Sequence, residues 1–340
     1  MNVSFIIIAY NGGEDLRYLL KDLKNQTYPH KKIEVLLIDS NSTDNTKEIM
    51  NEFLYSNKLF KTIKVLDNYK KILPCGWNIA LKEAKGDIIL RVDAHSRLPS
   101  DFIEKNVENI KIGEKIVGGK RISIINQENN WQRVLLQGEK SIFGSGIAKY
   151  RRDKKREYVK TLAHAAYSRE VFDNVGIYDE RLVRTEDNEM HYRMRKAGYK
   201  FLLDPNIVSY HNARNKLLKM CKQKFLNGYW IGLTLGIQPR CFSVYHFIPL
   251  IFVLVLAISF ILSISLYKNL FIFTIIPYIL ALILITIKSI LDDKFYIQLL
   301  LLPFILLFLH LSYGIGTLIG IIKLQFIILR SNKEVILNDL

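Results

Sequence analysis

The sequence has few cysteines and lacks the short glycine-rich motifs of two large nucleotide-binding classes. Its three cysteines (Cys75, Cys221 and Cys241) are too few in 340 residues for a disulfide framework, and their spacing fits no metal site. No Gly-x-Gly-x-x-Gly follows the first apolar segment and no Walker-type Gly-Lys-Ser occurs, so dinucleotide-binding and P-loop proteins lose their main support. An apolar content of 49% excludes a disordered chain.

A signal peptide is also missing, because the apolar segment 3–9 is short and has no basic residues before it. We therefore expect the first part of the chain to stay in the cytosol. The formal net charge of +16 is unevenly divided, since residues 1–245 carry +14 and residues 246–340 only +2. A basic, water-soluble part is followed by an apolar one.

The apolar part contains three long runs, at residues 247–266, 270–287 and 296–322. A helix needs about 20 apolar residues to cross a bilayer core. Three buried helices of a large soluble domain are the alternative, but no amphipathic partners remain to cover them. We predict about three transmembrane helices within 246–325, followed by a tail at 326–340.

The third run is the least regular of the three. It holds Gly314, Gly316 and Gly320, which could bend it or make it partly interfacial. The missing signal peptide predicts a multi-pass protein of the inner or plasma membrane, with its first part on the cytoplasmic side.

The first part alternates short apolar segments with helical patterns. We expect strands at 4–9, 33–38, 63–66 and 88–92, and helices at 15–25, 46–53 and 76–85. This alternation predicts an α/β fold, a parallel sheet with helices on both faces. Ligands of such sheets bind at the carboxyl ends of the strands, so the chemistry is expected just after Ala9, Ile38 and Val92.

Polar motifs stand at those three places. Tyr10-Asn11-Gly12 follows the first strand, Asp39 through Asp44 follow the second, and Asp93-Ala94-His95 follow the fourth. Residues two apart in an extended segment face the same side, so Asp93 and His95 converge. Mg²⁺ or Mn²⁺ is often held by one or two protein ligands together with substrate phosphates. We predict a divalent-cation site here, with a solvated turn as the alternative.

A second acidic cluster spans residues 185–189. Thr185 can cap a helix that Gly198 can end. Acids are common in first helical turns because the helix dipole favours them. The same dipole keeps a carboxylate ionised, as a general base requires.

Taken together and in this order, the motifs resemble family 2 glycosyltransferases. The matching residues are Tyr10-Asn11, Asp39 through Thr46, Asn78 before Gly86-Asp87, Asp93-Ala94-His95 and Thr185-Glu186-Asp187. The stretch 167–204 strengthens the resemblance, which is closest to the membrane-attached branch that builds bacterial exopolysaccharides of the succinoglycan type.

The resemblance implies a GT-A fold, a mostly parallel, Rossmann-like nucleotide-sugar-binding domain, at residues 1–240. Within it, 1–110 would be the nucleotide-binding half, 111–212 the acceptor half and 213–240 an interfacial helix, with the helical transmembrane region after it.

The resemblance also assigns roles to individual residues. Tyr10, Asn11, Asp39 and Asn78 would contact the nucleoside. Asp93, with His95, would bind the metal that bridges the two phosphates. Asp187 would be the general base, and Glu186 would help to hold acceptor or base in place. These are roles carried over from the family and not deduced from spacing.

Three positions depart from the family pattern. Ala9 stands where many members have Pro, Ser40 where many have a second Asp, and His95 replaces the last acid of Asp-x-Asp. Imidazole ligates Mn²⁺ more readily than Mg²⁺, so the sequence leaves both metals open. The implied reaction is an inverting transfer from a nucleoside-diphosphate sugar, with a UDP-sugar favoured.

A basic run at 149–160 includes Arg152 and Lys155. A solvated loop is the simplest interpretation. Nucleic acid is not expected as a partner, because no aromatic stacking pattern accompanies the run. An anionic leaflet or a lipid pyrophosphate fits better, which predicts a lipid-linked saccharide acceptor.

Further candidates for acceptor or membrane contact are His164, His211, Arg214, Gln223 and Trp230. The helix that begins near 217 has an apolar face and many lysines, which is typical of a helix on a membrane surface and equally of one packed on the domain. The stretch from Gln223 to Trp230 is similar to the Gln-x-x-Arg-Trp signature of processive synthases, but Tyr229 stands in place of the basic residue.

The sequence is compatible with two other functions and disfavours a third. A processive polysaccharide synthase is the nearest alternative enzyme. A membrane protein that binds nucleotide sugars without catalysis is an alternative of a different class. A nucleotidyltransferase is disfavoured, because a glycine-rich basic loop after the first strand is missing.

Overall fold

The computed structural model describes residues 1–126, 128–141, 144, 150, 155–265, 267–292 and 295–338, with the backbone alone at 265 and 328–338. Contacts divide the chain into two compact units. The first unit is Met1–Ile124 with Ala148–Asn212, and the second is Ile125–Ile147 with Ala213–Leu340. This grouping differs from the expected boundary at residue 240, because the helix after residue 216 packs with the C-terminal helices.

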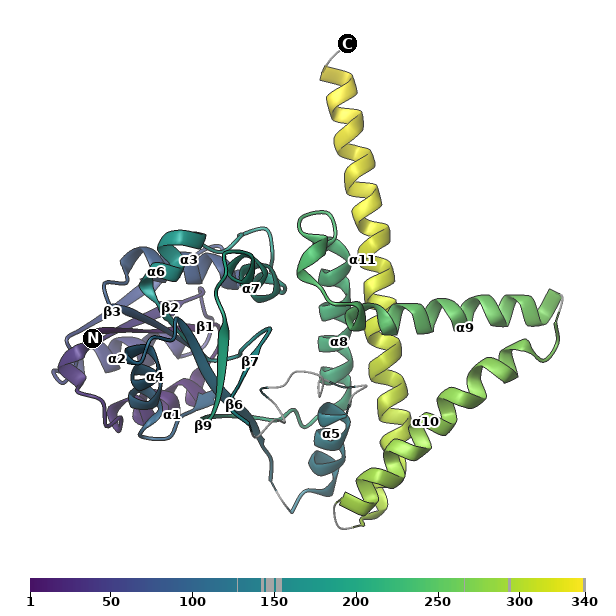
Figure 1. Cartoon of the computed structure of the whole chain (residues 1–340), viewed down its shortest axis with the longest axis horizontal. Coiled ribbons are helices and arrows are strands. Elements are labelled where there is room, and N and C mark those ends of the chain that lie inside the picture. Colours follow the sequence, from purple (N-terminus) through teal and green to yellow (C-terminus); the bar gives the residue numbers. More distant parts are fainter. Residues whose placement is uncertain are drawn as a thin grey trace. The chain divides into compact units, whose positions relative to one another are not determined.

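The first unit is built on one sheet, drawn in purple to teal in Figure 1. Its described strands are β1 (Val3–Ala9), β2 (Ile33–Asp39), β3 (Thr62–Asp67), β4 (Ile88–Asp93), β5 (Ser96–Arg97), β6 (Ile116–Ile124), β7 (Glu157–Val159), β8 (Ala165–Ser168) and β9 (Phe201–Asn212). The strand order is β3-β2-β1-β4-β8-β6-β9-β5, and β7 pairs with β9. The four predicted strands and the α/β class are confirmed.

The strands β3, β2, β1 and β4 run parallel, and β1 lies between β2 and β4. Every residue of β1 and β2 is buried, as in parallel strands covered on both faces. The order reverses at β1, because the chain moves outward through β2 and β3 and returns to the other side at β4. Such a reversal is where open α/β sheets bind ligands.

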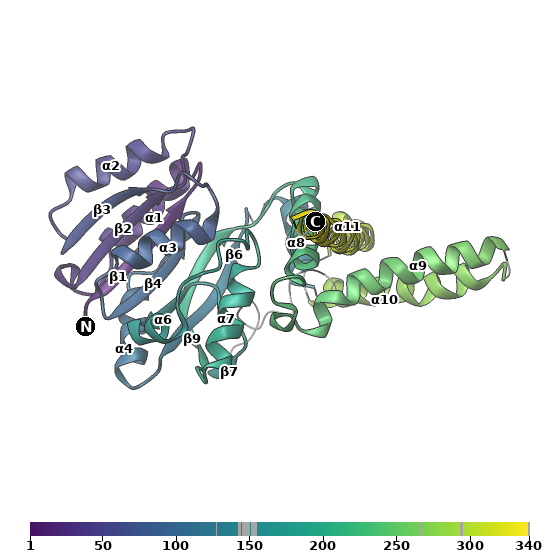
Figure 2. The ribbon, with the colours of Figure 1, turned by 90° about the horizontal axis from the view of Figure 1, so that it is seen from above.

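Helices cover both faces of this sheet (Figure 2). They are α1 (Gly13–Lys24), α2 (Thr46–Ser56), α3 (Leu73–Glu83), α4 (Phe102–Lys111), α6 (Arg169–Val175) and α7 (Glu186–Lys196). Apolar residues of α1, α2 and α4 belong to one core cluster, and those of α3, α6 and α7 to a second. The predicted helices are confirmed with shifted ends, since α3 starts at Leu73 with a proline in its first turn, where proline fits.

The strands β6 and β9 approach each other closely at a shift in register beside Gly119. A Cβ built on Gly119 would lie 1.8 Å from the carbonyl oxygen of Ile207. This contact involves backbone, so no side-chain rotation can relieve it. A glycine is therefore required where the second half of the sheet closes on itself.

The second unit is helical. Its described elements are α5 (Asn130–Lys140), α8 (Leu217–Thr234), η3 (Pro239–Cys241), η4 (Val244–Phe247), α9 (Ile248–Ser265), α10 (Leu270–Asp292), η5 (Ile297–Leu301) and α11 (Leu302–Asn338). Three described segments are long and apolar enough to cross a membrane: Val244–Ile264, Leu270–Asp292 and Ile297–Ile327. They match the three predicted runs.

The glycines of the third run do not break its helix, because α11 is continuous through them. They let α8 pack directly on the α11 backbone. A Cβ on Gly316 would lie 2.1 Å from the carbonyl of Phe225, and one on Gly228 would lie 2.1 Å from that of Tyr313. Small residues allow such close approach between helices. The helix near 217 therefore packs on α11, a contact that leaves both a membrane-surface position and packing on the first unit as predictions.

We expect Gly119→Ala to destabilise the protein by about 2 kcal/mol or more, because the new methyl overlaps the backbone of β9. Gly12→Ala is the matched control, since its Cβ would meet its nearest neighbours at 3.5 Å without a strained φ. Thermal unfolding of the detergent-solubilised chain, followed by near-ultraviolet circular dichroism, measures the difference. Equal midpoints for the two variants would contradict the role given to Gly119.

Candidate active site

The loops after β1 and β2 are joined by hydrogen bonds. Asn11 and Asn41 have positive φ values of 51° and 57°, a region that asparagine tolerates better than most residues. The Asn11 side-chain oxygen accepts a hydrogen bond from the Thr43 N–H at 2.8 Å, and the Asn11 N–H donates to the Ser42 hydroxyl at 3.0 Å. Tyr10 is 56% exposed beside them. The two polar motifs thus form one rim, with an aromatic ring open to solvent.

Beneath this rim lies Asp39, which is buried. Both of its carboxylate oxygens accept from the Ser42 N–H, at 3.2 and 3.3 Å. The neighbouring Asn68 is fully buried, and its amide donates to the Ser40 hydroxyl at 3.1 Å. Within the described residues the Asn68 side-chain oxygen has no hydrogen-bond partner. An unpaired buried acceptor is costly, so it could receive a donor from a ligand.

Asn78 on α3 binds backbone in this structure. Its amide nitrogen donates to the Tyr178 carbonyl at 2.9 Å, and its oxygen accepts from the Tyr178 N–H at 2.9 Å. The amide nitrogen also reaches Glu180 at 3.2 Å. Asn78 therefore fixes the loop before α7.

Asp93 ends β4, where two basic side chains approach its carboxylate. The His164 Nε2 lies 3.3 Å from Asp93 Oδ2, and an Arg121 guanidinium nitrogen lies 3.5 Å from the same oxygen. Burial opposes ionisation of Asp93, but His164, Arg121 and His95 outweigh it and hold its pKa well below the usual range. Burial lowers the pKa of His164 despite the pull of Asp93. Asp93 is thus an anion beside a neutral imidazole.

This arrangement fits a shared cation site. The described contacts of Asp93 with His164 and Arg121 are at Oδ2, and His95 is exposed two residues further on. Among the described residues, no group of three or more histidine, cysteine or acidic side chains could enclose a metal ion. An ionised carboxylate and one imidazole suit an ion whose other ligands are waters and phosphate oxygens.

Asp187, at the start of α7, is held by Arg91 of β4. The guanidinium donates two hydrogen bonds to the two carboxylate oxygens, one of them at 3.1 Å. The side chain of Arg91 is 7% exposed and that of Asp187 is 33% exposed. One face of this carboxylate is therefore tied to the sheet while another remains open to solvent.

Arg91 is itself fixed from three sides. Its guanidinium carbon lies 4.4 Å from the centre of the Trp77 ring and 5.7 Å from that of Tyr178. It also donates to the Tyr178 hydroxyl at 2.9 Å. Burial disfavours its charge, but Asp187 outweighs this effect and raises the pKa of Arg91 above its ordinary value. The result is a buried cation in contact with two neighbouring aromatic rings, whose centres lie 6.4 Å apart.

Glu186 precedes Asp187 and is buried. Burial first, and then the charge of Asp187, raise the pKa of Glu186 to about 8, so the carboxyl is protonated at neutral pH. Its Oε2 has no hydrogen-bond partner in the described part of the chain. The two adjacent acids therefore lie in different surroundings, because one is paired with Arg91 and the other is buried without a partner for Oε2 among the described residues.

The other candidate residues lie in different surroundings. His164 and His211 are buried; His211 lies on β9, 3.2 Å from the Ser123 hydroxyl. Lys155 is exposed, and Arg152 falls outside the described residues. Arg214, Gln223 and Trp230 belong to the second unit. The structure thus brings His164 to Asp93, although we had grouped it with the acceptor candidates.

The sequence analysis missed Arg91, Arg121 and Tyr178. A signal for Arg91 was present, because a lone arginine interrupts the apolar run 88–92 two residues before Asp93. Alternation along a strand puts these two residues on one side. Arg121 carries no such signal, since only the folding of distant strands brings it to the site, whereas Tyr178 lies in the stretch 167–204 that strengthens the family resemblance.

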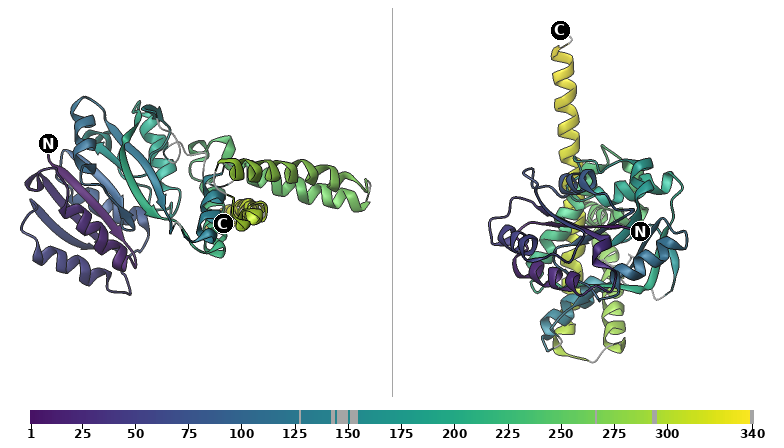
Figure 3. Two further views of the ribbon diagram at one scale, coloured as in Figure 1. Left: turned by 90° about the horizontal axis from the view of Figure 1, so that it is seen from below. Right: turned by 90° about the vertical axis from the view of Figure 1, so that its left-hand side faces the viewer.

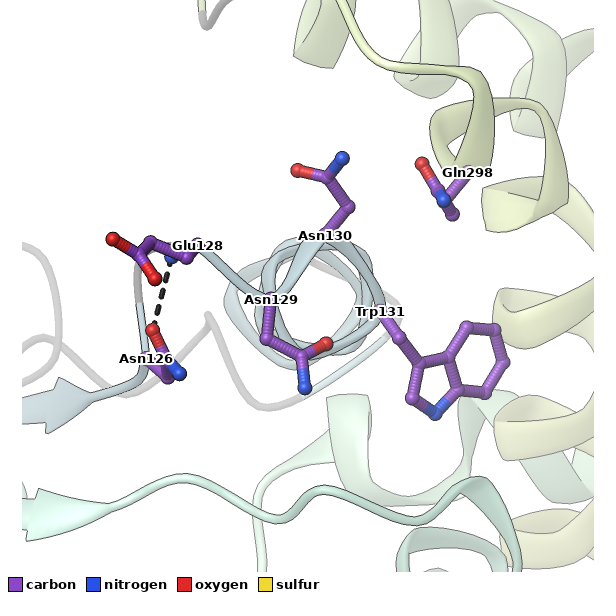
Figure 4. Close-up of a pocket in the computed structure, with 6 residues that line it drawn as sticks. All are labelled: Asn126, Glu128, Asn129, Asn130, Trp131 and Gln298. Carbon is purple, nitrogen blue, oxygen red and sulfur yellow. Dashed lines mark hydrogen bonds between the residues drawn. The ribbon is translucent and has the colours of Figure 1, made fainter.

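A polar hollow of about 450 Å³ lies elsewhere, in the second unit (Figure 4). Its lining residues are Asn126, Glu128, Asn129, Asn130, Trp131 and Gln298. None of the residues predicted for catalysis or nucleotide binding belongs to it.

Comparison with known proteins identifies the family. Residues 4–176 match the model of glycosyl transferase family 2. A dolichyl N-acetyl-alpha-D-glucosaminyl phosphate 3-beta-D-2,3-diacetamido-2,3-dideoxy-beta-D-glucuronosyltransferase of Methanococcus voltae is 28% identical over 94% of this chain and 97% of its own length. The succinoglycan biosynthesis protein ExoA of Rhizobium meliloti is 28% identical over 67% of each chain.

A solved structure shows the same fold. It is the mannosyltransferase PcManGT of Pyrobaculum calidifontis, in complex with GDP-Man and Mn²⁺, at a TM-score of 0.61 and 15% identity. The superposition covers 93% of this chain and 87% of that one. The predicted GT-A fold is confirmed, and this chain is a glycosyltransferase that belongs to glycosyl transferase family 2.

Proposed function

We propose that this enzyme transfers a sugar, with inversion, from a nucleoside-diphosphate sugar to a lipid-linked saccharide at the cytoplasmic face of a membrane. The observation that carries the proposal is the pairing of Asp187 with Arg91 beside the ionised Asp93, at the carboxyl edge of β4. This edge combines a partly exposed carboxylate base with a carboxylate suited to a cation.

The donor would bind across the loops after β1, β2 and β4. The exposed ring of Tyr10 offers a stacking surface for a nucleobase. We favour a UDP-sugar, while the solved relative contains GDP-Man.

Asp93 and His95 would hold a divalent cation together with the diphosphate. Such an ion supplies Lewis-acid stabilisation of the departing nucleoside diphosphate. Arg121 lies beside Asp93 and adds a positive charge on the same side. His164 keeps the Asp93 carboxylate oriented through Nε2, and the hydroxyl of Ser209 lies 2.9 Å from Nδ1.

Asp187 would take the proton from the acceptor hydroxyl as that oxygen attacks the anomeric carbon. Arg91 fixes the orientation of this carboxylate, because both oxygens accept from one planar guanidinium. The protonated Glu186 adds no second negative charge beside the base at neutral pH. One displacement at that carbon inverts its configuration.

Two observations support a lipid-linked acceptor. The chain has three segments long and apolar enough to cross a membrane, and its first 245 residues are strongly basic. The name of the Methanococcus voltae relative specifies a dolichyl phosphate-linked sugar as its substrate. A basic surface beside a bilayer would attract the phosphates of such an acceptor.

Asp187→Asn should reduce transfer at least 100-fold and leave donor binding intact, because it removes the proton acceptor and keeps the shape. Asp173→Asn is the matched control, since Asp173 is an exposed residue of α6. Incorporation of labelled sugar into membrane lipids measures transfer, and calorimetry measures donor binding. Transfer within a few-fold of the unsubstituted enzyme would place the base elsewhere.

Asp93→Ala should abolish the metal-dependent part of donor binding, since the diphosphate then meets the site without its cation. The measurement is calorimetry with UDP and GDP, each with Mn²⁺, with Mg²⁺ and with EDTA. Asp101→Ala, at the partly exposed residue before α4, serves as the control. Binding that is equally strong in variant, control and EDTA would remove the metal from the proposal.

The raised pKa of Glu186 predicts how kcat/KM depends on pH. Its raised pKa means that the carboxyl is neutral below about pH 8 and becomes an anion beside Asp187 above it. We expect kcat/KM to fall on the alkaline side for this reason. Glu186→Gln stays neutral at every pH and should flatten that fall while keeping most activity at pH 7. An unchanged alkaline limb in the variant would show that another group titrates there.

A further inference from the structure

We infer that α11 does not cross the bilayer but lies in its interface, and that only the α9–α10 hairpin spans the membrane. The interaction surface is an apolar stripe along α11, and its partner is the boundary between lipid headgroups and acyl chains. This inference does not rest on the transfer reaction, because every measurement below can be made on the inactive Asp187→Asn variant.

The contacts within the second unit show that α11 crosses the base of the hairpin. On α9 they involve its first residues, where Phe252 stacks on His310 of α11 with ring centres 4.8 Å apart. A Cβ on Gly314 would lie 2.2 Å from the Pro249 carbonyl. On α10, the Tyr278 hydroxyl lies 3.1 Å from the His310 Nδ1, and apolar residues from Leu282 to Ile290 pack in the same buried cluster as the start of α11.

Beyond these contacts the far half of α9 and the start of α10 project away from α11 (Figures 1 and 3). The helices therefore cross, and do not run side by side as three spanning helices would. If the hairpin follows the bilayer normal, α11 must lie across that normal.

The α11 segment also differs from the two hairpin segments in how much of it is buried within the protein. Only 11% of each hairpin window is buried within the protein, compared with 44% of the α11 window. The large exposed side chains of α11 include Phe304, Phe308, Ile315, Ile319, Ile322 and Phe326. Their spacings of three, four and seven residues put them on one face of the helix. Because α8 covers the opposite side of α11, this stripe is the face of α11 that is left open to lipid.

The other face of α11 is covered by α8, which lies on the side away from the hairpin (Figures 1 and 2). This helix carries Lys219 and Lys222, which are exposed, and Lys224, which donates to the Gly144 carbonyl at 2.8 Å. If α11 spanned the bilayer, α8 would be carried into the hydrocarbon with it. Charged side chains are disfavoured there, whereas an interface leaves them among headgroups and water.

The polar hollow of Figure 4 agrees with this depth. It lies between the first turn of α5 and η5, which follows the end of the hairpin. Gln298 lines it, and the side-chain oxygen of Gln298 is buried without a hydrogen-bond partner among the described residues. Amide groups of this kind require water or headgroups nearby.

Charge along the sequence fits two crossings better than three. Two crossings place Lys323, Arg330 and Lys333 on the same side of the membrane as the strongly basic first 245 residues. Three crossings would put them on the opposite side. Cytoplasmic segments near membrane helices are enriched in lysine and arginine.

The first test locates the two ends of the full-length chain. Epitope tags at residues 1 and 340 should both be cleaved by protease added to inverted vesicles and both be protected in right-side-out vesicles. A cysteine at Lys268, in the hairpin loop, should react only from the other face. Tags on opposite faces would overturn the inference, and so would a loop cysteine that reacts from the same face as the tags.

The second test measures depth. The variants Phe304→Cys, Ile315→Cys and Ile322→Cys are made one at a time in a chain whose native cysteines are replaced by alanine, and each cysteine is labelled with a fluorophore. Lipids that carry quenchers at known depths then give the depth of each label from the extent of quenching. The labels should lie at one shallow depth. A spanning α11 would instead separate the outer two by roughly 27 Å, at 1.5 Å per residue.

Labels at Ile251, Ile258 and Ile264 of α9 are the matched control. These positions should show a gradient of about 20 Å through the bilayer, because α9 is taken to span it. A gradient along α11 equal to that of α9 would overturn the inference, and so would a single shallow depth along α9.

Discussion

The arrangement of this active site depends on the ion pair between the buried Arg91 and Asp187. A guanidinium inside a sheet is tolerated only when it is paired and hydrogen-bonded, and here it contacts the rings of Trp77 and Tyr178 and is paired with Asp187. Replacing Asp187 by an apolar residue would leave the Arg91 guanidinium buried without an acceptor for its hydrogen bonds. The pair thereby ties the start of α7 to β4, two residues from Asp93.

Different surroundings give the acids of this site different states. Asp93 is kept ionised by the basic groups around it, whereas the buried Glu186 is kept protonated. Under the proposed function the site would bind a diphosphate and accept a proton, and an excess of carboxylate charge would oppose both. The neutral Glu186 limits repulsion next to the base, and the basic neighbours of Asp93 prepare the region for phosphates.

In the helical unit, the cost of burying charge limits how deep α8 and α11 can lie in a membrane. The glycines of α8 and α11 let the two backbones touch, so α8 must share the depth of α11. Each lysine at the centre of a spanning helix costs about 2.5–3.5 kcal/mol, and α8 carries several. The glycine contacts keep α8 beside α11, and the lysines of α8 oppose a position in the hydrocarbon. Together they favour two crossings of the bilayer over three.

The sequence by itself determined the α/β class, the four parallel strands, the three apolar segments and the edge at which polar motifs gather, because these follow from local periodicity and strand direction. It also marked Asp93 and Asp187, through their motifs. The tertiary structure decided what those residues contact: Arg91 for Asp187, and His164 and Arg121 for Asp93. It also decided that the glycines of α11 receive α8 and do not bend the helix. Such contacts join residues far apart in the chain, and local pattern holds no information about which distant side chain fills a given space.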